Sequence, residues 1–375
     1  MQYSYHYPAL EEILSLYKKE QLKNVYILGC QHILEPQAKM IELIHEYSVP
    51  KENIFMFGKI YSTSNEVLKN LSLEGFNISQ PEFNSNISFD LQHSENSRKE
   101  FIRFLSLIKN PSKIVILDDG GELLKVVNDK FNLIPEGVPV LGVEQTSSGF
   151  RKLEKSKINF PIFNVARSSV KLIKESPLIA ELGCQRVIDV FEKYNIENPR
   201  VLVVGLGPIG ANMLSILSSK GYFVLGYDIA HHDAEDIVNL IKNNDINTVI
   251  GAVGANIVDS NKIEEIKDII KHNVYLISMS SADREFPAVY VREKANSFSG
   301  VHLDVIWENI ILVNNGFPIT FKGNVYESTP KEIEKTIGLL LGSTLESVFS
   351  SEALSNGFID VPKYVIDIIE KYESN

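Results

Sequence analysis

The segment Val201-Leu-Val-Val-Gly205-Leu-Gly207-Pro-Ile-Gly210 is the most informative part of this sequence about its fold class. It is an apolar strand that runs into the pattern G-x-G-x-x-G, and a helix is predicted to follow over 211–220. The first glycine permits a tight turn, the second lets backbone approach a pyrophosphate, and the third lets the helix pack against the strand. Because the free N–H groups of the helix N-terminus would face an anion, we predict a dinucleotide site at Gly205, Gly207, Ile209 and Gly210.

An acidic residue follows this motif at the spacing that a ribose contact requires. Asp228 comes eighteen residues after Gly210, at the end of a strand predicted over 223–227. Its carboxylate would accept hydrogen bonds from a ribose 2'-hydroxyl and would repel a 2'-phosphate, so the predicted cofactor is NAD rather than NADP. The alternative, a glycine-rich turn with no ligand, is weakened because strand, helix and acidic residue all occur together.

Short apolar runs alternate with amphipathic stretches on both sides of the motif. Each run is too short for a helix and is bounded by turn residues; the runs lie at 25–28, 54–57, 114–117, 138–143, 162–165, 201–204, 223–227, 248–250 and 274–277. This alternation predicts an α/β fold built on parallel sheets, in two domains. Helices are predicted near 10–17, at 330–349 and at 362–372, and residues 84–96 are predicted to be a polar surface excursion before a helix at 101–108.

The composition is that of a globular protein and excludes several classes of partner. The 375 residues are 44% hydrophobic and 23% charged, and 37 Lys and Arg against 48 Asp and Glu give a net charge of -11. That charge repels phosphate backbones and anionic lipids, so neither nucleic acid nor membrane is expected as a partner. Cys30 and Cys184 supply neither a disulfide framework nor a metal site, and without a signal peptide or a long apolar run the expected compartment is the cytoplasm.

Four further segments together resemble adenosylhomocysteinase, the NAD-dependent enzyme that cleaves S-adenosylhomocysteine to adenosine and homocysteine. The segments are Gly29-Cys-Gln-His32, Ile116-Leu-Asp-Asp-Gly-Gly121, Gly142-Val-Glu-Gln-Thr-Ser-Ser-Gly149 and Phe163-Asn-Val-Ala-Arg-Ser-Ser-Val-Lys171 leading to Gly183-Cys184. The resemblance runs in order from Tyr7 to about Phe349. It implies a Rossmann-type NAD-binding domain at 183–328 inserted in a parallel-sheet substrate domain at 1–182, with C-terminal helices at 329–375 that return to the substrate domain.

The resemblance also implies an unusual reaction and roles for particular residues. In that family NAD oxidises a ribose 3'-hydroxyl, a thiol is eliminated from the 5' carbon, water adds, and the ketone is reduced again. By this resemblance Lys171 assists removal of the hydroxyl proton, Asp119 takes the proton from the neighbouring carbon, and His32 lies near the leaving group. The ordinary alternatives are a solvated lysine, a helix cap or turn, and a structural histidine.

Further contacts follow from the same resemblance. Asp118 and Gln145 would bind the substrate, and the nicotinamide end of NAD would contact Thr146, Ser147 and Ser148, which otherwise suit a helix cap. His302 is a candidate replacement for a histidine that the family has and this chain lacks, and its alternative is a surface turn. The implied partner is a nucleoside-type small molecule, and the implied assembly is a homo-oligomer.

The departures from the family concentrate in the substrate half. Gln145 stands in place of a glutamate, Ala166 in place of an asparagine, and the stretch between Lys171 and Cys184 lacks the family's Asp-Asn pair, for which Glu175 or Glu181 are candidate substitutes. Gly-His-Phe-Asp and Gly-His-Pro are replaced by Ser280-Ser281-Ala282-Asp283 and Gly323-Asn324-Val325, and the sequence ends at Asn375 without the family's basic tail.

These departures predict that hydrolysis of S-adenosylhomocysteine is weak or absent. The sequence therefore predicts an NAD-dependent enzyme that oxidises a ribose hydroxyl of a nucleoside-type substrate, with or without elimination at the 5' carbon. Two alternatives stay open. One is a nucleoside or sugar dehydrogenase or epimerase without 5' cleavage, and the other is a sensor that binds NAD or a nucleoside without catalysis.

Overall fold

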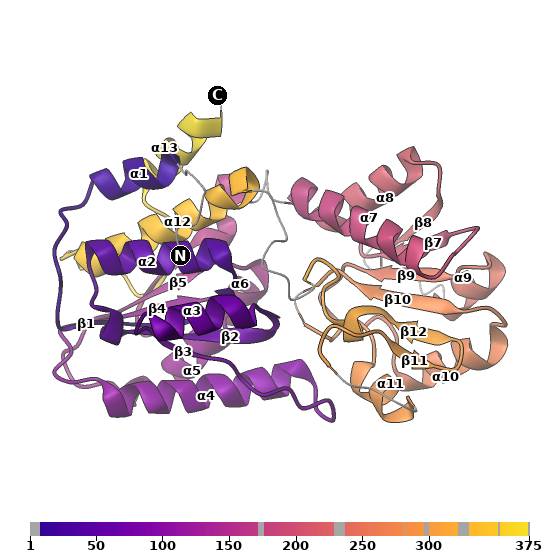
Figure 1. Ribbon diagram of the computed structural model, residues 1–375, viewed down its shortest axis with the longest axis horizontal. Coiled ribbons are helices and arrows are strands. Elements are labelled where there is room, and N and C mark those ends of the chain that lie inside the picture. The colour runs from indigo at the N-terminus through magenta and orange to yellow at the C-terminus, as the bar shows by residue number, and fades with distance from the viewer. Residues whose placement is uncertain are drawn as a thin grey trace. The chain divides into compact units, whose positions relative to one another are not determined.

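The computed structural model describes residues 8–171, 176–228, 237–280, 282–295, 300–321, 330–351 and 353–373. The chain divides into two compact units, each with its own parallel sheet (Figure 1). The first unit consists of Met1–Glu82, His93–Lys174 and Asn324–Asn375, and the second of Phe83–Gln92 and Glu175–Gly323. The sequence predicts boundaries after 182 and after 328, and it assigns 83–92 to the first domain. The predicted fold class, two α/β domains with parallel sheets, is confirmed.

The first unit contains a seven-stranded sheet whose neighbouring strands all pair in parallel. The strand order is β13-β6-β5-β4-β1-β2-β3. The bounds are β1 Val25–Ile33, β2 Ile54–Thr63, β3 Asn77–Ser79, β4 Lys113–Asp118, β5 Val140–Glu144, β6 Pro161–Asn164 and β13 Gly357–Ile359. The five runs predicted in this half are confirmed as the central strands, whereas β3 and β13, the two three-residue edge strands, were not predicted.

Helices cover both faces of this sheet, which explains why the runs Val25–Leu28 and Ile114–Leu117 in its central strands are continuously apolar. Alternate residues of β1 enter different cores: Val25 and Ile27 pack on one face, and Tyr26 and Leu28 on the other. The first face is covered by α1 Pro8–Ser15, α2 Glu35–Tyr47, α3 Asn65–Leu73, α12 Pro330–Phe349 and α13 Lys363–Glu373. The second face is covered by α4 Phe89–Leu107, α5 Glu122–Asp129 and α6 Ser147–Leu153.

The prediction for residues 84–96 is wrong from Phe89 onward, where α4 begins. Phe89 is buried, its ring lies 5.9 Å from that of Phe317, and its N–H donates to a carboxylate oxygen of Asp283 at 3.1 Å. These contacts join residues about 200 positions apart, so no local periodicity indicates them. The first turn of α4, up to Gln92, accordingly belongs to the second unit and the rest of the helix to the first.

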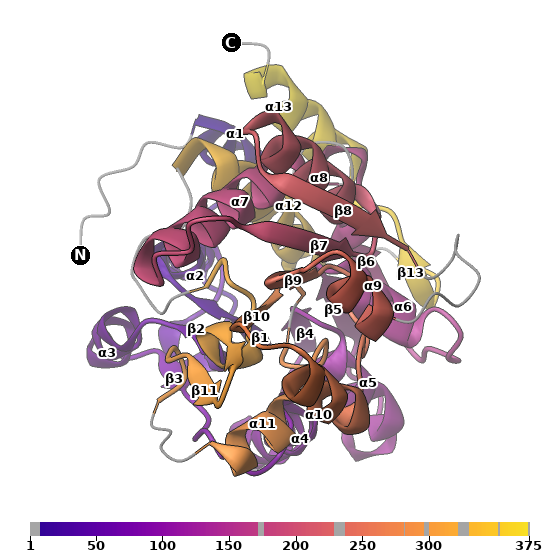
Figure 2. The same ribbon diagram turned by 90° about the vertical axis from the view of Figure 1, so that its right-hand side faces the viewer.

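The second unit has a six-stranded sheet in the order β11-β12-β10-β9-β7-β8, in which only β11 runs antiparallel among the described strands. The strands are β7 Arg200–Val204, β8 Phe223–Tyr227, β9 Thr248–Gly251, β10 Val274–Ser278, β11 Val305–Trp307 and β12 Ile310–Leu312. One face is covered by α7 Ser176–Lys193 and α8 Pro208–Ser219, and the other by α9 Ile237–Asn243, α10 Ser260–Ile269 and α11 Ala288–Lys294 (Figure 2).

Short 3-10 helices complete the described secondary structure: η1 Lys51–Asn53, η2 Phe131–Leu133, η3 Val165–Arg167 and η5 Val313–Gly316. Each sheet also has a point at which the strand order reverses. In the first unit it lies between β1 and β4, and in the second between β7 and β9. Ligands of open α/β sheets bind beyond the carboxyl ends of the strands at such points, so these two edges are where a site is expected.

Candidate functional site

The glycine-rich loop after β7 has the geometry that a bound pyrophosphate requires. Gly205 has φ +93°, a left-handed conformation, and an added Cβ would lie 2.9 Å from the carbonyl oxygen of Ala252. An added Cβ at Gly210 would overlap the carbonyl oxygen of Gly205. At Gly207, by contrast, a Cβ would meet no protein atom within 4 Å. Protein packing therefore explains the first and third glycines, and the second leaves open space beside the backbone.

The helix after this loop begins without a side-chain cap. Gly207 is the N-cap residue of α8, and Pro208 occupies the first turn, so the N–H groups that follow are available to an anion. Ile209 is half-buried against the core on the α7 and α8 side. The carboxylate of Asp228 accepts the N–H of Leu206 at 2.9 Å, which fixes the acidic group beside the glycine-rich loop.

A second carboxylate in this unit, Glu285, was not predicted. Its Oε1 accepts the N–H groups of Val253 at 2.7 Å and Gly254 at 3.0 Å, after β9. The hydroxyls of Ser278 and Ser280, at the end of β10, donate to the same carboxylate at 2.7 and 2.6 Å. Glu285 is fully buried and holds together the two loops that follow β9 and β10.

In the first unit, four neighbouring strands bring polar side chains together around Asp119. One oxygen of this carboxylate accepts a hydrogen bond from Lys59 Nζ; the other accepts one from Gln145 Nε2 and lies 3.1 Å from His32 Nε2. His32 and Lys59 come from β1 and β2, whereas Asp119 and Gln145 directly follow β4 and β5. The structure thus joins three of the predicted site residues and adds Lys59, which the sequence analysis missed. We call these four residues the Asp119 cluster.

The charges of this cluster stabilise one another. Burial alone would raise the pKa of the Asp119 carboxyl, but the adjacent Lys59 and His32 outweigh it and hold that pKa well below its ordinary value. Burial would lower the pKa of the Lys59 ammonium, but Asp119 outweighs it and keeps that pKa above its ordinary value. Lys59 and Asp119 are therefore a charged pair at neutral pH.

Two further carboxylates, Asp118 and Glu144, face each other in register across β4 and β5. Burial raises the pKa of Asp118 to about 6, and burial together with Asp118 raises the pKa of Glu144 to about 8. Asp118 accepts a hydrogen bond from the N–H of Leu124, in the first turn of α5, at 2.9 Å. This contact is helix capping, the ordinary structural role for a carboxylate at this place. Glu144, which was not predicted as a site residue, accepts the N–H and hydroxyl of Thr146 at 2.7 and 2.6 Å.

Several buried polar atoms along the same sheet edge have no hydrogen-bond partner among the described residues. They are both polar side-chain atoms of Gln31, Oδ1 of Asp118, Oε2 of Glu144, Oε1 of Gln145 and Oδ1 of Asn164. Leaving such groups unsatisfied costs about 1–3 kcal/mol each, so they are normally paired with water or a ligand. Because these atoms gather at the carboxyl ends of β1, β4, β5 and β6, this edge is a candidate binding site for a polar molecule.

The remaining predicted residues of the first unit stay predictions. Thr146 caps α6, because its hydroxyl accepts the N–H of Gly149 at 2.9 Å, and Ser147 and Ser148 form the first turn of that helix. The backbone N–H of Lys171 donates to the hydroxyl of Ser168 at 3.4 Å. Glu175, the first proposed substitute, lies outside the described residues, as does all of 172–175.

In the second unit, His302 lies in a turn, half-buried, with Nδ1 3.1 Å from Oδ1 of Asn314. Burial lowers the pKa of this imidazole. Glu181, the other proposed substitute, is exposed on α7. Ser281 and the segment 323–325 lie outside the described residues, so the family positions they replace have no structural account.

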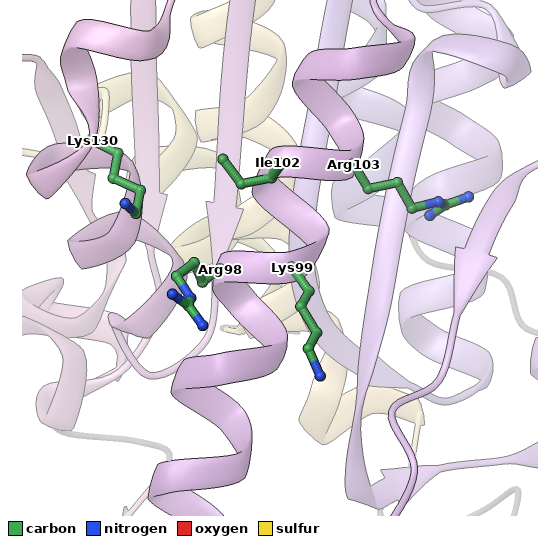
Figure 3. Close-up of a pocket in the computed structure, with 5 residues that line it drawn as sticks. All are labelled: Arg98, Lys99, Ile102, Arg103 and Lys130. Atoms are coloured by element: carbon green, nitrogen blue, oxygen red, sulfur yellow. The ribbon is translucent and has the colours of Figure 1, made fainter.

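A separate groove on the first unit lies along α4 and is lined by Arg98, Lys99, Ile102, Arg103 and Lys130. Arg98 and Ile102 extend toward Lys130, whereas Lys99 and Arg103 extend to the other side of the helix (Figure 3). The cations do not converge on one point, and none of these residues belongs to the Asp119 cluster. Among the described residues, no group of His, Cys, Asp or Glu is arranged to hold a metal ion, and no helix is long and apolar enough to cross a membrane.

No protein-family model matches the chain. Two uncharacterised proteins from strains of Mycobacterium tuberculosis are each 29% identical over 328 residues, which is 85% of this chain but 63% of theirs. This chain therefore spans less than two thirds of the length of these curated relatives.

Solved structures with a similar fold include a 2-hydroxyacid dehydrogenase from Ketogulonicigenium vulgare, at 14% identity and a TM-score of 0.43 over 89% of this chain and 98% of that one. Another is an NAD-complexed D-isomer specific 2-hydroxyacid dehydrogenase from Lactobacillus delbrueckii, at 12% identity and a TM-score of 0.37 over 85% and 96%. At these values neither structure assigns a reaction to this chain.

Proposed function

We propose that this chain is an NAD-dependent enzyme, similar to adenosylhomocysteinase, that oxidises a hydroxyl group of a nucleoside-type substrate. The single observation that carries the proposal is the open space at Gly207, beside an uncapped helix N-terminus and the carboxylate of Asp228. Gly207 has φ -64°, which any residue adopts, and an added Cβ would meet no protein atom within 4 Å. The close approach of a dinucleotide pyrophosphate would explain why this position is glycine.

The residues that fit NAD would hold it at both ends of its adenosine diphosphate part. Backbone N–H groups of the first turn of α8 would bind the pyrophosphate, and Asp228 would accept hydrogen bonds from the adenosine ribose. When bound, NAD supplies a hydride acceptor for the carbon that carries the substrate hydroxyl. Asp228 favours NAD over NADP because a 2'-phosphate would lie against its negative charge.

The Asp119 cluster supplies the groups that a polar substrate needs. Unpartnered acceptor atoms on Gln145, Gln31 and Asn164 suit hydroxyl donors, and the charged Lys59 donates hydrogen bonds. Three donors already surround the Asp119 carboxylate. One of these hydrogen bonds must therefore break before the carboxylate can accept a proton from the substrate. We assign that exchange to Gln145, because its amide carries no charge, whereas the hydrogen bond from the charged Lys59 is roughly twice as strong as a neutral one.

Substrate specificity in this proposal differs from that of adenosylhomocysteinase. Gln145 cannot act as a carboxylate base, and Ala166, buried in η3, carries no hydrogen-bonding side chain. Missing hydroxyl contacts in a site built for them lower kcat/KM by factors that can reach about 10⁴. We therefore expect little release of homocysteine from S-adenosylhomocysteine, and oxidation without 5' cleavage is the second candidate function.

The first experiment tests cofactor binding, and the second tests turnover. Purified protein is denatured and the supernatant is analysed for NAD, after which fresh protein is titrated with NAD and with NADP. We expect NAD to bind preferentially and Asp228→Ala to weaken it by about 1.5–3 kcal/mol, or roughly ten- to hundredfold. Equal affinity for NADP, or full affinity in Asp228→Ala, would contradict the assignment of this carboxylate.

For turnover, the NAD-loaded protein is mixed with adenosine, related nucleosides and S-adenosylhomocysteine, while the absorbance of reduced cofactor and the release of thiol are followed. A nucleoside that reduces the cofactor supports the proposal, and thiol release tells hydrolysis from plain oxidation. Tight NAD binding with no reduction by any nucleoside would point instead to the sensor. Homocysteine release on the order of 10 per second would restore the family's own reaction.

A further inference from the structure

The side chain of Glu285 joins two loops of the second unit by accepting hydrogen bonds from both. In the loop after β9, its Oε1 accepts the N–H groups of Val253 at 2.7 Å and Gly254 at 3.0 Å. In the loop after β10, its Oε2 accepts the N–H groups of Met279 at 3.2 Å and Ser280 at 3.3 Å. Two serine hydroxyls donate to the same carboxylate. Because the side chain is fully buried, water does not compete for these bonds.

The loop after β9 also lies against the glycine-rich loop. An added Cβ at Gly205 would lie 2.9 Å from the carbonyl oxygen of Ala252. The N–H of Ala252 donates to the carbonyl oxygen of Val204, at the end of β7, at 2.8 Å. This bond ties the first residue of the loop to β7 directly, whereas the Glu285 carboxylate holds the next two residues. The glycine-rich loop and the rest of the β9 loop therefore have different supports.

The strand order indicates which part of a dinucleotide each loop would face. Doubly wound sheets of this kind consist of two halves that each bind one mononucleotide, and the dinucleotide crosses the point where the strand order reverses. Here that point lies between β7 and β9. The glycine-rich loop and Asp228 follow β7 and β8, the half assigned above to the adenosine ribose and the pyrophosphate. The loops that Glu285 holds follow β9 and β10, so they would face the nicotinamide nucleotide.

We propose that Glu285 is a positioning residue that shapes the part of the site for the nicotinamide half of NAD. Because its carboxylate is fully buried, it acts through the backbone of the two loops rather than by contact with the cofactor. This inference rests on the proposed function, since it assumes a dinucleotide. Its structural premise does not: Glu285 orders the two loops before any cofactor binds.

The first test compares NAD with AMP, which lacks the nicotinamide half, in the wild-type protein and in Glu285→Gln. The amide nitrogen of glutamine would face backbone N–H groups at either oxygen position, and these groups cannot turn to accept a hydrogen bond. One loop therefore rearranges, and NAD binds only when that loop regains its shape with buried N–H groups left unpaired. We expect NAD to bind about ten- to hundredfold more weakly and AMP to bind as before.

A matched control makes the same substitution elsewhere in the second unit. Glu265 lies on α10 and is exposed, so Glu265→Gln should bind both ligands like the wild type. A general loss of structure in Glu285→Gln would weaken NAD and AMP together. The proposal is overturned if NAD and AMP lose affinity by the same factor, or if Glu285→Gln binds NAD as tightly as the wild type.

The second test needs no variant, so it decides the premise even if Glu285→Gln fails to fold. Hydrogen exchange of the ligand-free wild-type protein should show the amides of Val253, Gly254, Met279 and Ser280 protected, and NAD should add little. If they exchange like the amides of an unstructured peptide until NAD is added, the cofactor orders the loops, and the proposal is overturned. Failure of the wild type to bind NAD would contradict the proposed function and leave the ligand-free exchange as it is, so the two failures are distinguishable.

Discussion

Gly207 and Gly210 lie three residues apart in one loop, and the structure gives different reasons for the two glycines. A Cβ at Gly210 would overlap the carbonyl oxygen of Gly205, whereas a Cβ at Gly207 would meet open space. We therefore expect Gly210→Ala to lower the free energy of unfolding by roughly 1–3 kcal/mol. Gly207→Ala should unfold like the wild type yet bind NAD more weakly, because its methyl group occupies the space of the pyrophosphate.

Urea denaturation and NAD titration of the two glycine variants, measured side by side, check this prediction. Gly210→Ala serves as the control for a glycine that packing requires. If Gly207→Ala binds NAD as tightly as the wild type, the open space is not the pyrophosphate site. If Gly207→Ala unfolds at a lower urea concentration than the wild type, glycine at this position has a structural role that these contacts do not show.

Glu144 predicts a pH dependence of stability whose sign follows from its raised pKa. The carboxyl titrates near 4.5 when unfolded and at about 8 when folded, so between these values the folded protein binds more protons than the unfolded chain. Its contribution to stability is therefore fully present below about pH 4.5 and is lost as the pH rises through 8. Asp118, whose pKa is raised to about 6, likewise lowers the free energy of unfolding as the pH rises toward 6. Asp119, whose pKa is lowered, has the opposite effect at more acidic pH: its contribution to stability is lost as the pH falls.

Between pH 6 and 8 we therefore expect the free energy of unfolding to decline in the wild type and to decline less in Glu144→Gln, which keeps an uncharged side chain of the same shape. Urea titrations at several pH values measure the two slopes. Glu136→Gln, at an exposed glutamate, should keep the wild-type slope. Parallel slopes for wild type and Glu144→Gln would show that Glu144 is ionised throughout this range.

At the scale of elements, the beginning of α4 is held to the second unit by a buried ion pair. Asp283 accepts hydrogen bonds from the N–H of Phe89 and from Arg292, at 3.1 and 2.7 Å, and both charged side chains are at most 2% exposed. Asp283→Ala would leave the guanidinium buried without its anion, so we expect it to lower the free energy of unfolding by about 3–5 kcal/mol.

The neighbouring Arg284 provides the matched control. It pairs with Asp90 at 2.6 Å, but its side chain is 27% exposed and that of Asp90 is 49% exposed. Exposed ion pairs contribute little, so Arg284→Ala should cost less than about 1 kcal/mol. Urea denaturation of both variants gives the comparison. Equal losses would mean that burial does not set the strength of the ion pair at Asp283.

The elements that the sequence predicted well are those whose information is local. Central strands such as β1 and β7 contain continuous apolar runs, Val25–Leu28 and Val201–Val204, because helices cover both faces of their sheets. The edge strands β3 and β13 have three residues each, too few to show a pattern. The first turn of α4 is held by Asp283, about 200 residues away, so periodicity could not predict it.

The same contrast between local patterns and contacts of distant residues applies to the candidate site. Motifs predicted His32, Asp119 and Gln145, each beside the end of an apolar strand. Lys59 was missed because its partner lies 60 residues along the chain, and a lone lysine in an apolar run gives no sign of an acidic neighbour. Glu285 was missed because backbone N–H groups, which any sequence supplies, are among its principal partners.

At the scale of the whole molecule, each unit has hydrophobic cores of its own. Residues of β1, α2 and α12 share one core of the first unit, whereas β7, β9 and α10 contribute to a core of the second. Proteins with separate cores commonly unfold in more than one step. The sole tryptophan of the sequence, Trp307, is buried in the core of the second unit, so its fluorescence reports on that unit.

We therefore expect saturating NAD to raise the thermal transition seen by Trp307 fluorescence, because a ligand stabilises the fold that binds it by about 2.7 kcal/mol at one hundred times its Kd. Far-UV circular dichroism, to which both units contribute, should contain this shifted transition and a second one that NAD leaves in place. In Asp228→Ala the fluorescence transition should move only at higher NAD concentration. If NAD shifts the whole circular dichroism curve as one transition, the two units unfold together. If NAD does not shift the fluorescence transition, the cofactor does not bind at the Gly205–Gly210 loop.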